Sequence, residues 1–317
     1  MENSLRVIPI ECKFGPTSAY AYYIDALEPA LIDTGIASSA SQEIESVLKQ
    51  HGRRIEDIRW ILLTHGHVDH LGGARAVWEK TGGRAEIVIP QKEAYLLRDR
   101  SEHIKDYKGL QGKYLDSKAQ EKHTSILMND IGGNLEPTVE VVDGDQISLG
   151  GEVSITVVET PGHSIGSVTF VLDGLDWAFA ADAVQMYGGA KSGIPTIEYP
   201  VLYRQSLKRL LDEVCPKRLY LGHHFLNSSG NVVSEQVDGD EVSAVLRDSL
   251  EMDTNLAEMV HRHLRDHAEF NKDDELYGPF KSIADELNYT GNPRNLPCAF
   301  FVTMNGYKEE LVGVHKK

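Results

Sequence analysis

The alternation of apolar and polar residues over the first 90 positions predicts strands that alternate with helices. Strand patterns occupy residues 6–10, 18–24, 29–35, 59–63 and 85–89. Between them, Ile44, Val47 and Leu48 recur at the spacing of one helix face, which predicts a helix over 40–51, and residues 74–80 indicate another. This order is typical of an α/β layer.

Residues 91–135 interrupt the alternation with a polar, helical pattern. We interpret this segment as either a lid beside a site or a surface insertion. Strand patterns resume at 139–142, 146–149, 154–158, 167–172 and 177–181, and a helix near 203–214 precedes a strand at 218–221. The chain to this point therefore has two strand-rich halves.

The segment from residue 240 onward has a different pattern. Over 240–264 it reads as an amphipathic helix with a loose apolar stripe, formed by Leu246, Leu250, Leu256, Met259, Val260 and Leu264. We divide the chain into residues 1–239 and a mainly helical extension, 240–317, packed on them. We expect the stripe to dock beside the site and select substrates. Docking on the far side, or a homodimer contact, stays open.

Composition narrows the class of protein. Apolar residues make up 41% of the chain, enough for a sizeable core, and no run is long enough to span a bilayer. A net charge of −16 repels phosphate backbones, so we expect no nucleic-acid partner and no membrane partner. We expect no secretory signal in the first residues, and the three cysteines form no CxxC pair. We expect a cytoplasmic location.

The chemistry concentrates in Thr-His-Gly-His-Val-Asp-His-Leu-Gly-Gly, residues 64–73, where a strand gives way to a helix. Three histidines and one aspartate within six residues suit a divalent metal such as zinc. His65 and His67 are separated by one residue and can point the same way. Asp69 and His70 begin the next turn and cannot easily share that metal. The spacing therefore favours two neighbouring metals.

Three later residues supply further ligands, and each follows a predicted strand. They are His163 in Pro-Gly-His-Ser, Asp182 in Ala-Ala-Asp-Ala and His223 in Leu-Gly-His-His. A glycine precedes both histidines, which lets the backbone come close to a site.

This set, His-x-His-x-Asp-His followed by His, Asp and His, resembles the metallo-β-lactamase superfamily of metallohydrolases, over about two thirds of the chain. The resemblance implies an αββα sandwich of two mixed sheets with outer helices. It implies that His65, His67 and His163 hold one metal, that Asp69, His70 and His223 hold the second, and that Asp182 bridges both. His224 is the alternative to His223. Zinc is the favoured metal, with iron and manganese open.

The positions at which this chain departs from the family's motifs indicate which branch of the superfamily it resembles. True β-lactamases place cysteine or serine at the position of Asp182, and glyoxalase II-like enzymes carry a basic glutathione-contacting set that we do not find here. An evident tRNA-binding arm is also missing. The body is most similar to hydrolases of esters, thioesters and lactones. Ala181 stands where many relatives have glycine.

We therefore expect a dinuclear hydrolase in which a metal-bound hydroxide attacks the carbonyl of a small-molecule acyl substrate. Asp69 would orient the nucleophile or accept its proton. Tyr187 would donate a hydrogen bond to the oxyanion or the leaving group. Asp33 would accept a hydrogen bond from a ligand histidine. An iron-dependent oxidoreductase, a phosphodiesterase and a catalytically weak binding protein are the alternatives.

Overall fold

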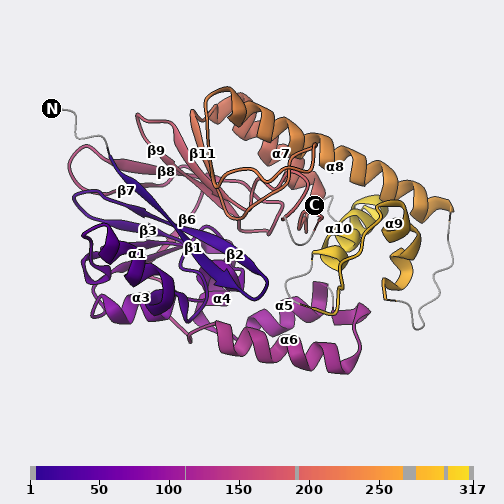
Figure 1. Ribbon diagram of the computed structural model, residues 1–317, viewed down its shortest axis with the longest axis horizontal. Coiled ribbons are helices and arrows are strands. Elements are labelled where there is room, and N and C mark those ends of the chain that lie inside the picture. The colour runs from indigo at the N-terminus through magenta and orange to yellow at the C-terminus, as the bar shows by residue number, and fades with distance from the viewer. Residues whose placement is uncertain (1–4, 111, 190–192, 267–275, 296–298, 314–317) are drawn as a thin grey trace.

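Two β-sheets lie face to face, and helices cover their outer surfaces (Figure 1). The computed structural model describes residues 5–110, 112–189, 193–266, 276–295 and 299–313, so Cys298 lies outside the described residues. Each sheet has six strands within these ranges. The αββα sandwich of two mixed sheets that the family resemblance implies is confirmed.

The first sheet follows the chain in the order β1 to β6. Its strands are β1 (Val7–Phe14), β2 (Thr17–Ile24), β3 (Ala30–Ile32), β4 (Trp60–Leu62), β5 (Glu86–Pro90) and β6 (Val139–Val141). β1, β2 and β3 pair antiparallel, whereas β3, β4, β5 and β6 pair parallel. Parallel neighbours end at the same sheet edge, so the segments that follow β3, β4 and β5 meet there.

The second sheet has the order β12-β11-β10-β9-β8-β7. Its strands are β7 (Gln146–Ser148), β8 (Ser154–Glu159), β9 (Val168–Leu172), β10 (Trp177–Ala181), β11 (Arg218–Leu221) and β12 (Gln236–Asp238). Only β10 and β11 pair parallel here. The short edge strand β12 was not predicted.

Aromatic side chains fill the space between the sheets. The rings of Phe179 and Tyr220 stack with centroids 4.4 Å apart, and Tyr22 of the opposite sheet packs on both. The Tyr22 hydroxyl is buried and donates to the Leu221 carbonyl at 2.5 Å. Each such ring contributes roughly 1.5–3 kcal/mol by leaving water, so this layer holds the two sheets, and with them the two halves of the site, in fixed relation.

Helices of the first half cover the first sheet. They are α1 (Glu45–Gln50, after a π-helical turn at Ala40–Ile44), α2 (Val68–Leu71), α3 (Ala74–Lys80), α4 (Ala94–Arg98), α5 (Glu102–Leu110) and α6 (Ser117–Asp130). The predicted helix over 40–51 thus consists of two joined pieces. The insertion is helical, as expected, and α6 begins where the Asp116 side chain accepts a hydrogen bond from the Ala119 amide.

The second sheet is covered by α7 (Pro200–Arg209) and α8 (Asp240–Asp266), and two further C-terminal helices, α9 (Lys281–Glu286) and α10 (Phe300–Val312), pack on these helices. The α8 stripe packs into one core with α7, α10 and strands β10 and β11, through Leu246, Leu256 and Val260. Figure 1 shows α8 running along one side of the molecule, with α9 and α10 at its far end. In the described ranges, no helix is both long and apolar enough to cross a bilayer.

A buried ion pair fastens these C-terminal helices to α7. The Arg204 Nε donates to Asp253 Oδ2 at 2.5 Å, and the Tyr307 hydroxyl donates to Asp253 Oδ1 at 3.0 Å. Asp253 is 0% exposed, so both oxygens need these partners. Burial raises the pKa of Asp253, although Arg204 opposes the shift.

We expect Asp253→Asn to lower the free energy of unfolding by about 2–4 kcal/mol, because the Arg204 guanidinium loses its buried counter-charge. Urea unfolding followed by tryptophan fluorescence measures this. Glu258→Gln, an exposed change on the same helix, is the control and should alter the midpoint little. Equal midpoints for the two variants would show that the ion pair does not fasten the extension.

Candidate metal centre

The proposed ligands come together because strand ends from both sheets meet at one edge. In the first sheet, Asp33 follows β3 and the 64–73 motif follows β4. In the second, Asp182 follows β10 and His223 lies just beyond β11, its parallel neighbour. His163 stands in the turn between β8 and β9. Residues distant in sequence therefore face one another across the sandwich.

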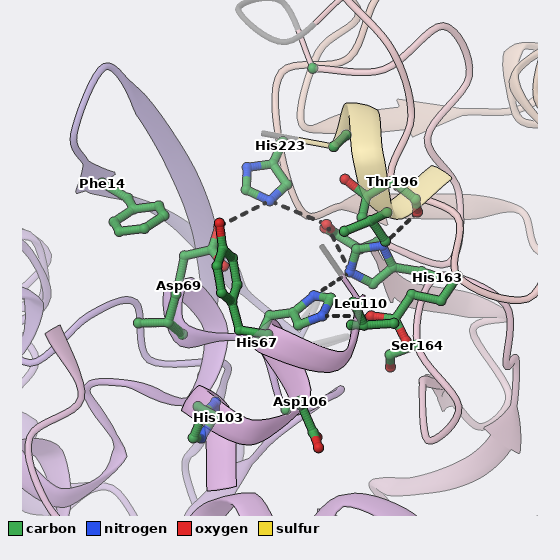
Figure 2. Close-up of a pocket in the computed structure, with 18 of the residues that line it drawn as sticks. Phe14, His67, Asp69, His103, Asp106, Leu110, His163, Ser164, Thr196 and His223 are labelled. Atoms are coloured by element: carbon green, nitrogen blue, oxygen red, sulfur yellow. Dashed lines mark hydrogen bonds and ion pairs between the residues drawn. The ribbon is translucent and has the colours of Figure 1, made fainter. Parts of the chain in front are cut away.

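Three imidazoles form the first half of the site. The Nδ1 atom of His67 lies 2.7 Å from Nε2 of His163, which lies 3.2 Å from Nε2 of His65. Figure 2 shows His67 and His163 pointing toward one another. These three nitrogens lie within 4.8 Å of one another and could together hold a metal ion.

The second half combines imidazole with carboxylate. Nε2 of His223 lies 3.3 Å from Nε2 of His70 and 3.5 Å from Oδ2 of Asp69, and these three residues form a second potential metal site. His224 does not join it, because its ring bonds to the Tyr20 hydroxyl instead. The structure therefore places His223, rather than His224, in the cluster.

Asp182 lies between the two halves. One oxygen, Oδ2, is 3.5 Å from Nε2 of His163 and 3.3 Å from Nε2 of His223, and the other, Oδ1, is 3.5 Å from Nε2 of His70. Oδ1 is buried and has no hydrogen-bond partner among the described residues. A buried, unpartnered carboxylate oxygen is costly unless a cation compensates it, so this arrangement fits two metals with Asp182 between them.

The pKa shifts of His163, His65 and His223 are consistent with a metal centre at this position. Burial lowers the pKa of His163 to about 3 and that of His65 well below its ordinary value. Both are therefore neutral, which is the form that binds a metal. Burial opposes charge on His223 as well, but the Asp182 carboxylate outweighs it and raises the His223 pKa to about 10. A cation would supply the positive charge that Asp182 attracts.

Local backbone features aim Asp182 and His223 into the cluster. The pairing of β10 with β11 shifts between Phe179 and Ala181, and Ala181 has φ +44°. That left-handed conformation costs an L-residue about 1–2 kcal/mol, which explains why glycine suits this position. Gly222 cannot carry a side chain, because a Cβ there would lie 2.0 Å from Asp182 Oδ1.

Hydrogen bonds from neighbouring groups fix the ligand rings. Asp33 Oδ2 accepts from His70 Nδ1 at 2.8 Å, as expected from the sequence, and from the Thr64 hydroxyl. His163 Nδ1 donates to the Thr196 carbonyl at 2.9 Å, and His223 Nδ1 donates to the Ser18 carbonyl at 2.6 Å. Each bond leaves the other ring nitrogen free to face the centre.

Two buried glutamates near the site were missed by the sequence analysis. Glu93 accepts from the backbone N–H of Gly66 at 2.5 Å and of Gly166 at 2.8 Å, and so joins the motif loop to the His163 loop. Glu198 lies 3.3 Å from Nε2 of His67. Glu93 follows β5, a strand parallel to β4, and that position is the only sequence signal for it. Glu198 has none.

Tyr187 is not brought to the site. Its backbone N–H bonds to the Leu226 carbonyl, and its ring packs into the core shared with α8. Burial raises its pKa, with Glu251 and Asp248 of α8 adding to the shift. It is absent from the described residues that line the cavity over the metal centre, so the structure gives it no contact with a substrate there.

That cavity has a volume of about 800 Å³ and opens over the clustered ligands. The insertion contributes Tyr107, Leu110 and Leu127, so it lies beside the site rather than on a remote surface. The C-terminal extension contributes Ala299 and Val302, from the start of α10. The expectation that the α8 stripe would border the pocket is wrong, because that stripe is used in packing against α7 and the second sheet.

Comparison with known proteins agrees with this geometry. The sequence profile of the metallo-beta-lactamase superfamily matches residues 13–238. A probable metallo-hydrolase from Burkholderia pseudomallei is 29% identical over 198 residues, covering 59% of this chain and 58% of that protein. A hydroxyacylglutathione hydrolase from Bradyrhizobium is 29% identical over 194 residues, with the same coverage. The chain thus spans less than two thirds of the length of either relative.

Among solved structures, a metallo-beta-lactamase family protein from Thermus thermophilus superposes with a TM-score of 0.68 at 18% identity, covering 98% of this chain and 93% of that one. This likeness supports the fold. The profile match covers well over half of the chain, and the chain therefore belongs to the metallo-beta-lactamase superfamily, whose members are typically hydrolytic metalloenzymes with two divalent metals.

We expect Asp182→Asn to reduce bound metal from about two ions per chain to about one, because a neutral amide cannot compensate two cations. Elemental analysis after dialysis measures the ratio, and circular dichroism should show the fold retained. Asp176→Asn, at a turn before β10, is the control. Two tightly held metals in Asp182→Asn would exclude the bridging role.

We expect Glu93→Gln to weaken metal binding by about tenfold, as changes behind ligand histidines do. The amide has only one acceptor oxygen for two backbone N–H groups, so the Gly66 and Gly166 loops would separate. Chelator competition with Zn²⁺ measures the affinity. Glu86→Gln, exposed at the start of β5, should bind like the wild type. Equal affinities in both variants would contradict a positioning role for Glu93.

Proposed function

We propose that this protein is a dinuclear metal-dependent hydrolase that cleaves the carbonyl bond of a small-molecule ester, thioester or lactone. The observation that carries the proposal is the position of Asp182, within 3.5 Å of histidine nitrogens from both halves of the site. His65, His67 and His163 would hold one metal, and Asp69, His70 and His223 the other. Zinc is favoured by the ligand types, and iron or manganese would also accept them.

When bound, the two cations would supply Lewis acidity and lower the pKa of a water molecule toward neutrality. The chain's own contribution is to place groups around the reacting carbonyl. Asp69 lines the cavity and its Oδ2 lies 3.5 Å from Nε2 of His223, which supports a role for its carboxylate in accepting a proton from the attacking water. Its role in catalysis is part of this proposal.

A second tyrosine, Tyr199, borders the cavity and is a candidate for the donor role. Burial raises the Tyr199 pKa to about 12, so the hydroxyl keeps its proton at neutral pH. Tyr199 therefore fits the donor role for which the sequence suggested Tyr187, which lies outside the lining.

The cavity walls favour an acyl compound over a polyanion. Leu96, Leu110, Ile165 and Val302 provide apolar surface, which is usual for small-molecule sites. Net charge is −16, which opposes a phosphate backbone. The relatives named hydroxyacylglutathione hydrolase act, by that name, on an acyl compound. A cytoplasmic location and the absence of nucleic-acid and membrane partners remain expectations within this proposal.

The test is a substrate panel on the purified, metal-loaded protein. p-Nitrophenyl esters, acyl thioesters and lactones should be hydrolysed, with bis-p-nitrophenyl phosphate much slower. His67→Ala should lose at least a hundredfold in kcat/KM together with bound metal, because one of three nitrogens is removed. His51→Ala, at an exposed turn, is the matched control.

Three results would overturn the proposal. The first is hydrolysis by His67→Ala at the wild-type rate, since the activity would then not depend on the metal centre. The second is a preference for the phosphodiester, and the third is oxygen consumption by the iron-loaded protein without hydrolysis. The last two outcomes would assign the site to a phosphodiesterase or to an oxidoreductase.

A further inference from the structure

We propose that the C-terminal extension acts as a positioning element for the first metal, through the hydroxyl of Thr303 on α10. The path runs from Thr303 to the loop of residues 194–198, and from that loop to His163 and His67. The inference deepens the proposed function and rests on its metal centre. It assigns to the extension a role in metal binding, beyond its contribution to the cavity wall.

The first step is a pair of hydrogen bonds between α10 and the 194–198 loop. The Thr303 hydroxyl donates to the Pro195 carbonyl at 2.7 Å and accepts from the Ile197 N–H at 3.1 Å. Thr303 is 0% exposed, so water cannot replace either bond. The two bonded residues flank Thr196 on both sides. One side chain of the extension therefore fixes the peptide groups on both sides of Thr196.

The second step leads from the loop to the ligand histidines. The Thr196 carbonyl accepts the Nδ1–H of His163 at 2.9 Å, and Figure 2 shows Thr196 beside that ring. Two residues later, Glu198 Oε1 lies 3.3 Å from Nε2 of His67, whose Nδ1 faces the centre. The loop thus contacts the outer nitrogen of two of the three ligands in the first half of the site. A shift of the loop would rotate both rings.

A close backbone approach supports the same path. A Cβ at Gly306 would lie 2.7 Å from the Ile197 carbonyl oxygen and 2.8 Å from that of Glu198. Glycine inside a helix destabilises it relative to alanine, and α10 has this glycine where it packs on the loop. The loop is therefore held between α10 and the metal site, with little room to relax.

The 194–198 loop also makes hydrogen bonds that do not involve Thr303. The Thr196 N–H donates to Gln185 Oε1 at 2.6 Å, and the Glu198 N–H donates to the Gly162 carbonyl at 2.9 Å. These bonds hold the loop from the side of the site. Thr303 adds one bond to each peptide group next to Thr196, and the Ile197 N–H that it accepts belongs to the same peptide group as the Thr196 carbonyl.

The experiment compares three variants of the full chain. Thr303→Val keeps the shape and removes the hydroxyl, and Thr303→Ser restores a hydroxyl. Thr254→Val removes an exposed threonine hydroxyl of α8 that donates to the Leu250 carbonyl. Zn²⁺ affinity is measured by chelator competition, and the ligand field by the absorption spectrum of the Co²⁺-loaded protein. We expect Thr303→Val to bind one of its two Zn²⁺ ions about tenfold more weakly, with a changed Co²⁺ spectrum. Thr303→Ser and Thr254→Val should match the wild type.

The outcomes separate this inference from the proposed function. If the wild type binds two Zn²⁺ ions and Thr303→Val binds them equally well, with only a lower melting temperature, Thr303 is a packing residue and the inference is wrong. If the wild type binds no metal, both the proposed function and the inference are wrong. If Thr303→Val does not fold, Gly306→Ala takes its place, and unchanged Zn²⁺ affinity there overturns the inference.

Discussion

The buried carboxylate of Asp182 is the constraint on which the structure of the site depends. It is 6% exposed, lies among three histidine nitrogens and has one oxygen without a hydrogen-bond partner in the described part of the chain. A charge in this position is costly unless cations compensate it. Both sheets, the strained backbone at Ala181 and the glycine at 222 serve to bring it there, so the centre is built into the fold.

Two features of the structure hold the proposed ligands in place. Strand ends bring the imidazoles and carboxylates within 4.8 Å of one another, and neighbouring groups then fix each ring through its outer nitrogen. For His70 that neighbour is Asp33, which directly follows β3 of the first sheet, and for His163 it is the carbonyl of Thr196, in a loop that α10 contacts. The two halves of the proposed centre therefore draw on different parts of the chain for their stability.

The cavity, like the proposed metal centre, is formed by two distant parts of the chain. The insertion after β5 and the start of α10 both reach it, although about 190 residues of sequence separate Leu110 from Val302. Tyr114 of the insertion stacks on Phe301 with centroids 4.9 Å apart, and its hydroxyl donates to Asn305. The extension therefore lines the cavity through Ala299 and Val302 and contacts the loop behind the first half of the proposed metal centre through Thr303.

The sequence predicted the fold class and the proposed ligand set through its resemblance to the superfamily, and it suggested Asp33 as the partner of a ligand histidine. The motifs that carry the resemblance are local and can be read in order along the chain. Only the tertiary structure decided among residues whose roles depend on contacts across the fold. It placed His223 rather than His224 in the cluster, set Tyr187 apart from the cavity, and brought α10 instead of α8 to the pocket. Glu93, Glu198 and Thr303 act through bonds to backbone or ring atoms 27, 131 and 106 positions away in the chain, and no local pattern encodes a contact at that separation.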